Sequence, residues 1–173
     1  MKRINGLLPC VLSAKKKGWT TFFIPKDNLF ELEYIPGITI YPLEHFSDVV
    51  NYVVFGRELP SISAHKDIGQ LSESQPFEVD FEHIKGQVLA KRALALAAAG
   101  FHNALMIGAP GSGKTMMSKA MKSILPPLDF SEMLEVSQIY SVVGKLHKDL
   151  PLITQRPFRQ IHHTASRFSI IGG

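Results

Sequence analysis

The segment Gly108–Thr115, with the sequence GAPGSGKT, constrains the fold of this chain more than any other feature. It matches the pattern G-x-x-x-x-G-K-[S/T] in full, which marks a phosphate-binding loop between a strand and a helix. The flanking residues agree: Asn103–Ile107 is apolar and predicts the strand, and Lys114–Ile124 predicts a helix that ends before Pro126. The sequence therefore predicts a strand–loop–helix unit of an α/β protein.

The residue types in this loop suit a nucleoside triphosphate. Glycines let backbone N–H groups turn toward phosphate oxygens, and the positive end of the following helix points at the same anion. Lys114 would supply a mobile charge for the terminal phosphates, and the Thr115 hydroxyl would ligate Mg²⁺. We therefore predict ATP and Mg²⁺ as cofactors, with Thr115 as the metal ligand. The predicted cofactor-binding residues are Gly108, Ala109, Pro110, Gly111, Ser112, Gly113, Lys114 and Thr115.

Composition favours a cytoplasmic location. The chain has 173 residues, 45% of them hydrophobic, and no run approaches the roughly 18 apolar residues of a membrane span. The apolar run near the start is interrupted at Lys15–Lys17, so a signal peptide is not predicted. Cys10 is the only cysteine, which excludes an internal disulfide. We expect a cytoplasmic protein with no membrane partner.

Charge is distributed unevenly along the chain. Residues 58–82 carry one basic and six acidic side chains, whereas residues 83–173 carry eleven basic and four acidic ones. Residues 58–76 lack apolar periodicity and predict an acidic linker between a first unit, residues 1–57, and a second unit, residues 77–173. Two interpretations of the basic half remain: a solvated face, or a surface for phosphate-bearing partners such as DNA.

The first unit alternates helices and short strands, which is typical of an α/β fold. Residue patterns predict a helix over Leu7–Lys17, strands over Trp19–Ile24 and Ile38–Tyr41, and a closing helix over Phe46–Phe55. So few residues make a thin core, so we expect this unit to be incomplete or to lean on another element. The residues of the closing helix expected to face inward are Phe46, Val49, Val50, Val53 and Val54.

Several positions of the first unit match a known pattern: Gly6, Leu7, Ala14, Gly18, Ile24–Asn28, Ile35, Pro36, Val49 and Val50. They resemble the C-terminal part of a Lon-type (S5-like) protease domain. In that family a catalytic lysine follows the first glycine, and aligning Gly6 and Gly18 places Cys10 there. A Ser–Lys dyad needs both members, and the family's serine lies upstream of this sequence. Proteolysis is therefore rejected, and the unit is interpreted as a structural or interaction remnant.

Other residues of the second unit leave alternatives open. Ile84 and Gly86 suit either an adenine pocket or plain core packing. The Ala-rich segment Val88–Ala99 predicts a helix packed closely on its neighbours. Asp129 and Glu132 form a capping box that starts a further helix, so Glu132 is interpreted as a cap and not as a catalytic acid.

The segment near the end of the chain contains arginine and histidine side chains. Arg156, Arg159 and His162 suit contact with phosphate or a neighbouring subunit, or are ordinary loop residues. The adjacent His162 and His163 do not predict zinc, because neighbouring side chains diverge and no cysteine or acidic cluster completes a site.

A larger pattern joins these segments: Ile84–Gln87, Ala90–Leu94, Ala97–Gly100, His102, Asn103, the loop itself, Ile124–Leu128, Arg156–Arg159 and His162–Ser166. It resembles the Mg-chelatase-like AAA+ ATPases of the ComM/YifB competence type, over nearly the whole chain. The resemblance implies a partial Lon-like α/β unit followed by a partial three-layer α/β/α P-loop NTPase domain. It also implies a bacterial cytoplasmic ATPase that forms rings, an assembly not assigned to a fragment, and a link to DNA processing. Ile161 departs from the family, which usually has proline there.

Hydrolysis in this family needs an apolar strand ending in acidic residues, the Walker B strand. No segment after Thr115 has that pattern, and Asp149 follows Leu146–Lys148, which is not a buried strand. In the family this strand follows glycines matching Gly172 and Gly173, so we expect a fragment without it and without the arginine finger. We predict ATP binding, no useful hydrolysis and no catalytic residue. The alternatives are a non-enzymatic DNA- or subunit-binding module, and a non-functional gene fragment.

Overall fold

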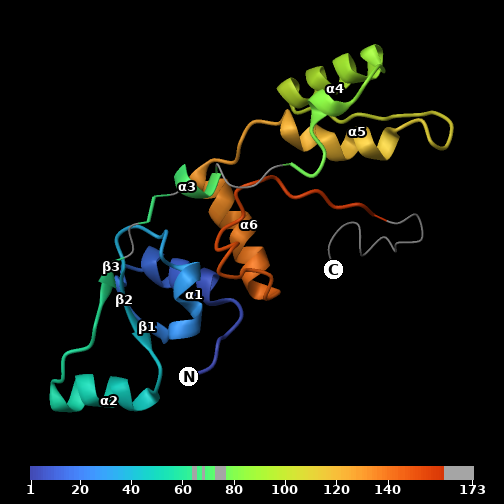
Figure 1. Cartoon of the computed structure of the whole chain (residues 1–173). Coiled ribbons are helices and arrows are strands. Elements are labelled where there is room, and N and C mark those ends of the chain that lie inside the picture. Colours follow the sequence, from blue (N-terminus) through green and yellow to red (C-terminus); the bar gives the residue numbers. More distant parts are fainter. Residues whose placement is uncertain (64–65, 68, 73–76, 162–173) are drawn as a thin grey trace. The chain divides into compact units, whose positions relative to one another are not determined.

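Contacts divide the computed structural model into two compact units, which are coloured by sequence in Figure 1. The first unit contains residues 1–75 and 128–154, and the second contains residues 76–127 and 155–173. The sequence analysis assigned all of residues 77–173 to the second unit, so the grouping of residues 128–154 differs from the expected boundaries. The residues that the structure describes are 1–63, 66–67, 69–72 and 77–161.

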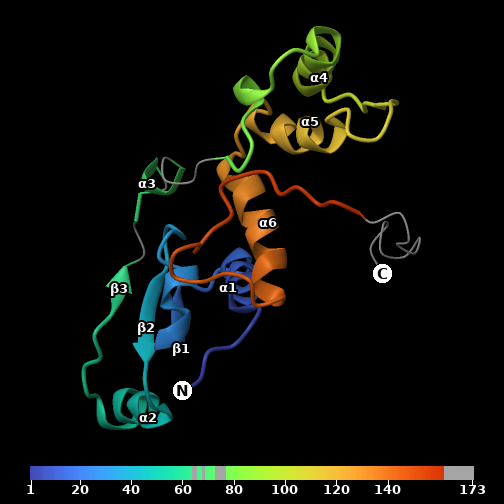
Figure 2. The ribbon, with the colours of Figure 1, turned by 45° about the vertical axis from the view of Figure 1, so that its right-hand side comes forward.

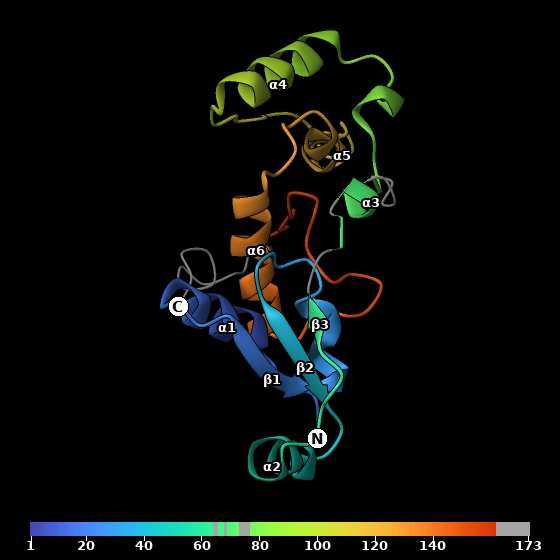
Figure 3. The ribbon, with the colours of Figure 1, turned by 90° about the vertical axis from the view of Figure 1, so that its left-hand side faces the viewer.

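A small mixed sheet lies in the first unit (Figure 3). Strand β1 (Thr21–Pro25) pairs in parallel with β2 (Thr39–Leu43), and β3 (Ile62–Ser63) pairs antiparallel with β2, giving the order β1-β2-β3. β-Branched and aromatic residues make up much of β1 and β2, as pleated and half-buried strands favour. Together with its helices, this sheet gives the first unit a partial α/β fold.

Two helices distant in sequence complete the core of the first unit (Figure 2). Helix α1 (Leu7–Lys16) agrees closely with the predicted range, and helix α6 (Phe130–Val142) lies beside it. A 3-10 turn, η1 (Lys26–Glu31), follows β1, and the short helix α3 (Gly69–Ser72) precedes the second unit. The fully buried core side chains include Leu8, Ile24, Leu32, Ile35, Ile40, Leu146 and Leu152.

The predicted capping box at the start of α6 is confirmed. The Glu132 backbone N–H donates to Asp129 Oδ1 at 2.8 Å, and the Asp129 N–H donates to Glu132 Oε2 at 3.1 Å. These bonds satisfy two backbone donors that a helix terminus otherwise leaves without an intrahelical partner. Glu132 therefore acts as a cap.

Helix α2 (Phe46–Phe55) forms over the predicted range, but its predicted burial is wrong. None of its residues is buried, and Phe46, Val53 and Val54 are 69%, 68% and 66% exposed. The side chain that it presents to the sheet is Tyr52, whose ring lies 5.3 Å from that of Tyr41. Apolar periodicity predicts a helix and its apolar face, but it does not determine whether another element covers that face.

The second unit is built from two helices and two short 3-10 turns. Helix α4 (Val88–Gly100) and helix α5 (Lys114–Ala120) are accompanied by η2 (Phe81–His83) and η3 (Met121–Ser123). Its core contains the buried side chains Ile84, Leu94, Met117 and Ala120. Ile84 is thus a core residue, one of the two interpretations that its sequence left open.

The strand predicted over Asn103–Ile107 is not formed. Leu105 and Ile107 are 86% and 90% exposed. A strand is defined by hydrogen bonds to a neighbour, and the described residues of the second unit contain no other strand to supply them. The helix predicted over Lys114–Ile124 is divided into α5 and η3. No helix in the described part of the chain is both long and apolar enough to span a bilayer.

Candidate phosphate-binding site

Two glycines determine the course of the predicted loop. Gly111 has φ +78° and Gly113 has φ +85°, both in the left-handed region that side chains with a Cβ rarely adopt. A Cβ built at either position meets nothing within 4 Å, so the requirement for glycine is conformational and not one of space. Gly113 is also the residue that precedes α5, whose first turn closes with Met117 N–H donating to Gly113 O at 2.9 Å.

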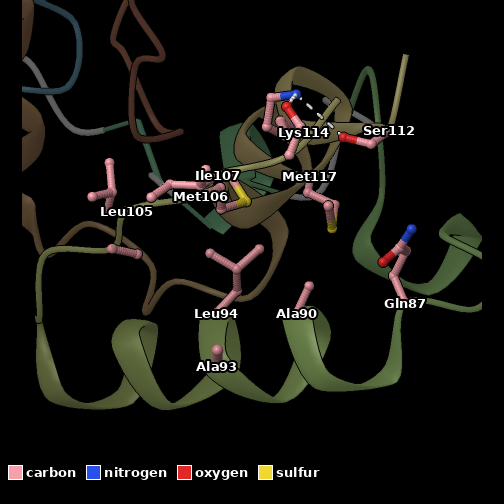
Figure 4. Close-up of a pocket in the computed structure, with 12 residues that line it drawn as sticks. Gln87, Ala90, Ala93, Leu94, Leu105, Met106, Ile107, Ser112, Lys114 and Met117 are labelled. Atoms are coloured by element: carbon pink, nitrogen blue, oxygen red, sulfur yellow. Dashed lines mark hydrogen bonds between the residues drawn. The ribbon is translucent and has the colours of Figure 1, made fainter. Parts of the chain in front are cut away.

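Lys114 closes the loop from inside (Figure 4). Its Nζ donates to Gly108 O at 2.9 Å, to Ala109 O at 2.7 Å and to Ser112 Oγ at 3.2 Å. The ammonium group thus lies within reach of both ends of the loop. A Cβ at Gly108 would come 3.2 Å from Ser112 Oγ, so this glycine is required by close approach.

Helix α5 is fixed to the rest of the second unit at its far end. Ser123 Oγ donates to Ala120 O at 3.0 Å and to Asp80 Oδ1 at 3.3 Å, and it accepts from Phe81 N–H at 2.9 Å. Met117 and Ala120, on the helix itself, are buried at 5% and 0% exposure. The loop therefore stands on a helix that is held by packing and by a three-bond serine junction.

A cavity of about 310 Å³ lies beside the loop (Figure 4). Ala90 and Leu94 of α4 form one wall, and Met117 of α5 lies across from them. Ser112 and Lys114 form the polar end of the cavity. An apolar space with a few polar groups at one end is the usual form of a small-molecule site.

The loop residues fit a triphosphate with a divalent cation. Lys114 Nζ is a mobile cation at the loop, and Thr115 follows it in the first turn of α5 with its side chain exposed. Triphosphates bring Mg²⁺ with them, and one hydroxyl from the protein beside the phosphates is a common form of such sites. In the part of the chain that the structure describes, no group of three His, Cys, Asp or Glu side chains forms a metal cluster of its own.

The other predicted residues lie apart from this loop. Arg156 Nε donates to Pro126 O at 2.8 Å, and Arg159 is exposed. His162 and His163 lie outside the described residues. Cys10 is exposed on α1, in the first unit.

The described residues after Thr115 include no strand, only an isolated bridge between His147 and Leu150. Asp149 lies between these two residues, and its side chain is 99% exposed. It therefore lacks the buried strand end on which a Walker B carboxylate stands.

Sequence reasoning missed a buried polar cluster in the first unit. Asn28, Glu31 and Ser141 are 0%, 0% and 1% exposed and are bonded to one another. The Ser141 and Glu31 positions are 110 residues apart, and no local spacing or motif connects them. The only signal was the position of Glu31 among apolar neighbours, which is too common to identify a buried carboxylate.

The profile of a family described as magnesium chelatase, subunit ChlI, matches residues 80–173. The chain is 41% identical to the protein YifB of Salmonella typhimurium over 175 residues and 32% identical to the competence protein ComM of Haemophilus influenzae over 173 residues. Each alignment covers 100% of this chain and 33% or 34% of the relative, so the chain spans about a third of their length. A Lon protease of Brevibacillus choshinensis is 38% identical over 56 residues, 30% of this chain and 7% of that protease.

Proposed function

Because this chain belongs to the magnesium chelatase (subunit ChlI) family, we propose that the loop Gly108–Thr115 binds the phosphates of ATP together with Mg²⁺. The observation that carries this proposal is the loop geometry, in which two left-handed glycines turn the backbone around the Lys114 ammonium. An anion with several oxygens is the ligand whose charge this arrangement complements. The similarity to ComM supports the further proposal that this is the nucleotide-binding part of an AAA+ ATPase of the competence type.

Binding exchanges the partners of Lys114. Its Nζ now donates to the carbonyl oxygens of Gly108 and Ala109, and phosphate oxygens are stronger acceptors because they are charged. Thr115 Oγ1 faces solvent at the start of α5 and is the protein oxygen offered to the cation. When bound, Mg²⁺ neutralises charge on the phosphate oxygens. The apolar wall of the adjacent cavity, at Ala90 and Leu94, accommodates the nucleoside.

We propose binding, and not turnover, for the described part of the chain. Hydrolysis requires acidic residues that hold the cation and polarise water. Asp149 stands in an exposed turn, and Glu132 is occupied as the cap of α6. Neither carboxylate has the surroundings of a catalytic acid.

Titration of the full chain with a fluorescent ATP analogue and Mg²⁺ tests this function. Lys114→Ala is expected to weaken binding at least tenfold, about 1.4 kcal/mol, because it removes the cation that phosphate would meet. The matched control is Lys122→Ala, which removes an equal charge from η3, outside the loop. Equal affinity of the two variants would refute the site. Steady phosphate release abolished by Lys114→Ala would refute the restriction to binding.

A second candidate function, DNA binding, is favoured by charge. Residues 83–173 carry eleven basic and four acidic side chains, and Lys85, Arg92 and Arg159 are exposed. A protein that neutralises DNA phosphates releases counterions, so its affinity falls steeply with salt. Filter-binding titrations across salt concentrations test this proposal, and an affinity that does not change with ionic strength would exclude it.

A further inference from the structure

Residues 128–154, here called the insert, lie in sequence between two parts of the second unit but pack in the first. The chain therefore leaves the second unit after Pro127 and returns to it at Gln155. Arg156 Nε donates to Pro126 O at 2.8 Å, which ties the two chain segments together beside the points of departure and return. Both segments are thus restrained wherever the insert is held.

The insert is held by a buried polar anchor on α6. Ser141 Oγ donates to Glu31 Oε2 at 2.7 Å, and the Gly6 N–H donates to Ser141 O at 3.0 Å. Ser141 and Glu31 are 1% and 0% exposed. A buried carboxylate without partners is costly, so this arrangement favours the docked position of α6 over any in which Glu31 loses its partner.

The first unit prepares this anchor in advance. Asn28 Nδ2 donates to Glu31 Oε1 at 3.0 Å and also to Ile4 O at 2.7 Å, and Asn28 Oδ1 accepts from Ile4 N–H at 3.0 Å. Arg3 lies 3.6 Å from Glu31 Oε1 and donates to the Leu146 carbonyl oxygen in the insert. Residues of the first unit thus orient one oxygen of Glu31 and leave the other for Ser141.

A second anchor holds the returning part of the insert. Ile153 N–H donates to Ser137 Oγ at 2.8 Å, and Ser137 is 0% exposed. Leu146 and Leu152 are 1% and 0% exposed in the core of the first unit. The insert therefore has two states that differ in many contacts at once: docked, with both anchors made, and undocked, with both lost.

The insert is connected to the phosphate-binding loop through few residues. Helix α5 begins at Lys114, η3 ends at Ser123, and Leu128, itself 5% exposed, is the first residue of the insert. We propose that docking of the insert on the first unit keeps α5 and its loop in the geometry that binds nucleotide, so that the Lon-like unit regulates nucleotide affinity. This inference rests on the proposed nucleotide function. Linkage requires the reverse as well, so bound nucleotide stabilises the docked insert.

Hydrogen exchange of the α6 amides and ATP affinity, measured on the full chain, test this coupling. Ser141→Ala and, separately, Ser137→Ala each remove one anchor. The matched control is Ser131→Ala, because Ser131 Oγ is exposed and donates to Asp129 Oδ1 at 2.9 Å. Both anchor variants are expected to speed exchange in α6 and to weaken ATP binding about fivefold, the lower range of allosteric couplings. The control is expected to change neither quantity.

The outcomes separate the inference from the function on which it rests. If the unmodified chain binds no ATP, the proposed function fails, and the coupling fails with it. If the unmodified chain binds ATP and the anchor variants exchange faster in α6 with unchanged affinity, the coupling alone is refuted. Unchanged exchange in both anchor variants would show that the serines do not hold the insert, which also refutes the proposal. ATP that slows α6 exchange in the unmodified chain supports it independently.

Discussion

Replacing the buried carboxylate of Glu31 is expected to destabilise the first unit strongly. Glu31 is 0% exposed and accepts hydrogen bonds from Ser141 Oγ at 2.7 Å and from Asn28 Nδ2 at 3.0 Å. In Glu31→Ala both donors lose a buried partner, at about 1–3 kcal/mol each. Arg3 is 33% exposed and finds water instead, so its share is small. The expected loss is about 3–5 kcal/mol of the free energy of unfolding, as for a broken buried ion pair.

Urea denaturation followed by fluorescence measures this loss. The chain has one tryptophan, Trp19, which lies in the first unit and reports on its unfolding. Glu31→Gln keeps an acceptor oxygen, so its cost is expected to be about 1–2 kcal/mol. The matched control is Glu33→Ala, which breaks a partly exposed pair with Lys66 worth less than about 1 kcal/mol.

The ranking of the three variants is the decisive result. The midpoint of unfolding should fall most for Glu31→Ala, less for Glu31→Gln and least for Glu33→Ala. If Glu31→Ala and Glu33→Ala shift the midpoint equally, the buried cluster contributes no more than a surface pair, and the reasoning is refuted. A changed slope in Glu31→Ala alone would instead report a change in the exposed surface on unfolding.

Three further predictions concern α2, a surface ion pair and the cavity. Val53→Ala on α2, at 68% exposure, should change the free energy of unfolding by less than about 0.5 kcal/mol. Leu8→Ala, at 0% exposure, should cost about 2–5 kcal/mol in the same urea titration. The hydrogen bond from Lys26, and then its charge, hold the pKa of Glu44 below its ordinary value, so Lys26→Ala should raise that pKa in an NMR titration. Because the folded-state pKa is the lower one, the pair stabilises above the unfolded pKa and is lost as pH falls through the folded pKa. Ala90→Phe fills the cavity and should weaken ATP binding at least tenfold, about 1.4 kcal/mol, but not inorganic triphosphate binding; unchanged ATP affinity would place the nucleoside elsewhere.

Local chemistry explains which parts of the structure could be predicted. The left-handed turns at Gly111 and Gly113, the start of α5 at Lys114 and the capping box at Asp129 depend on residues within a few positions of one another. Such features are written into short spacings, because the groups that satisfy each other are close along the chain. Helices α1 and α2 follow from apolar periodicity in the same way.

Contacts between distant segments could not be predicted. The Ser141–Glu31 bond joins positions 110 residues apart, and it decides that α6 packs in the first unit. Charge and composition place a boundary near residue 76, but they contain no information on a later return of the chain to the first unit. The exposure of Val53 was missed for a related reason, since the pattern of α2 does not contain the element that would cover it.

The unformed strand at Asn103–Ile107 shows how far the phosphate site depends on its fold. A strand obtains its backbone hydrogen bonds from a neighbour, so apolar residues alone do not produce one. The loop that follows does not share this dependence: Lys114 closes it through Gly108 and Ala109, and Ser123 fixes the end of its helix to Asp80. These contacts all lie between the loop, α5 with η3, and the segment before α4. The site geometry is therefore retained where the expected sheet is not, because the loop is determined by its own glycines and lysine.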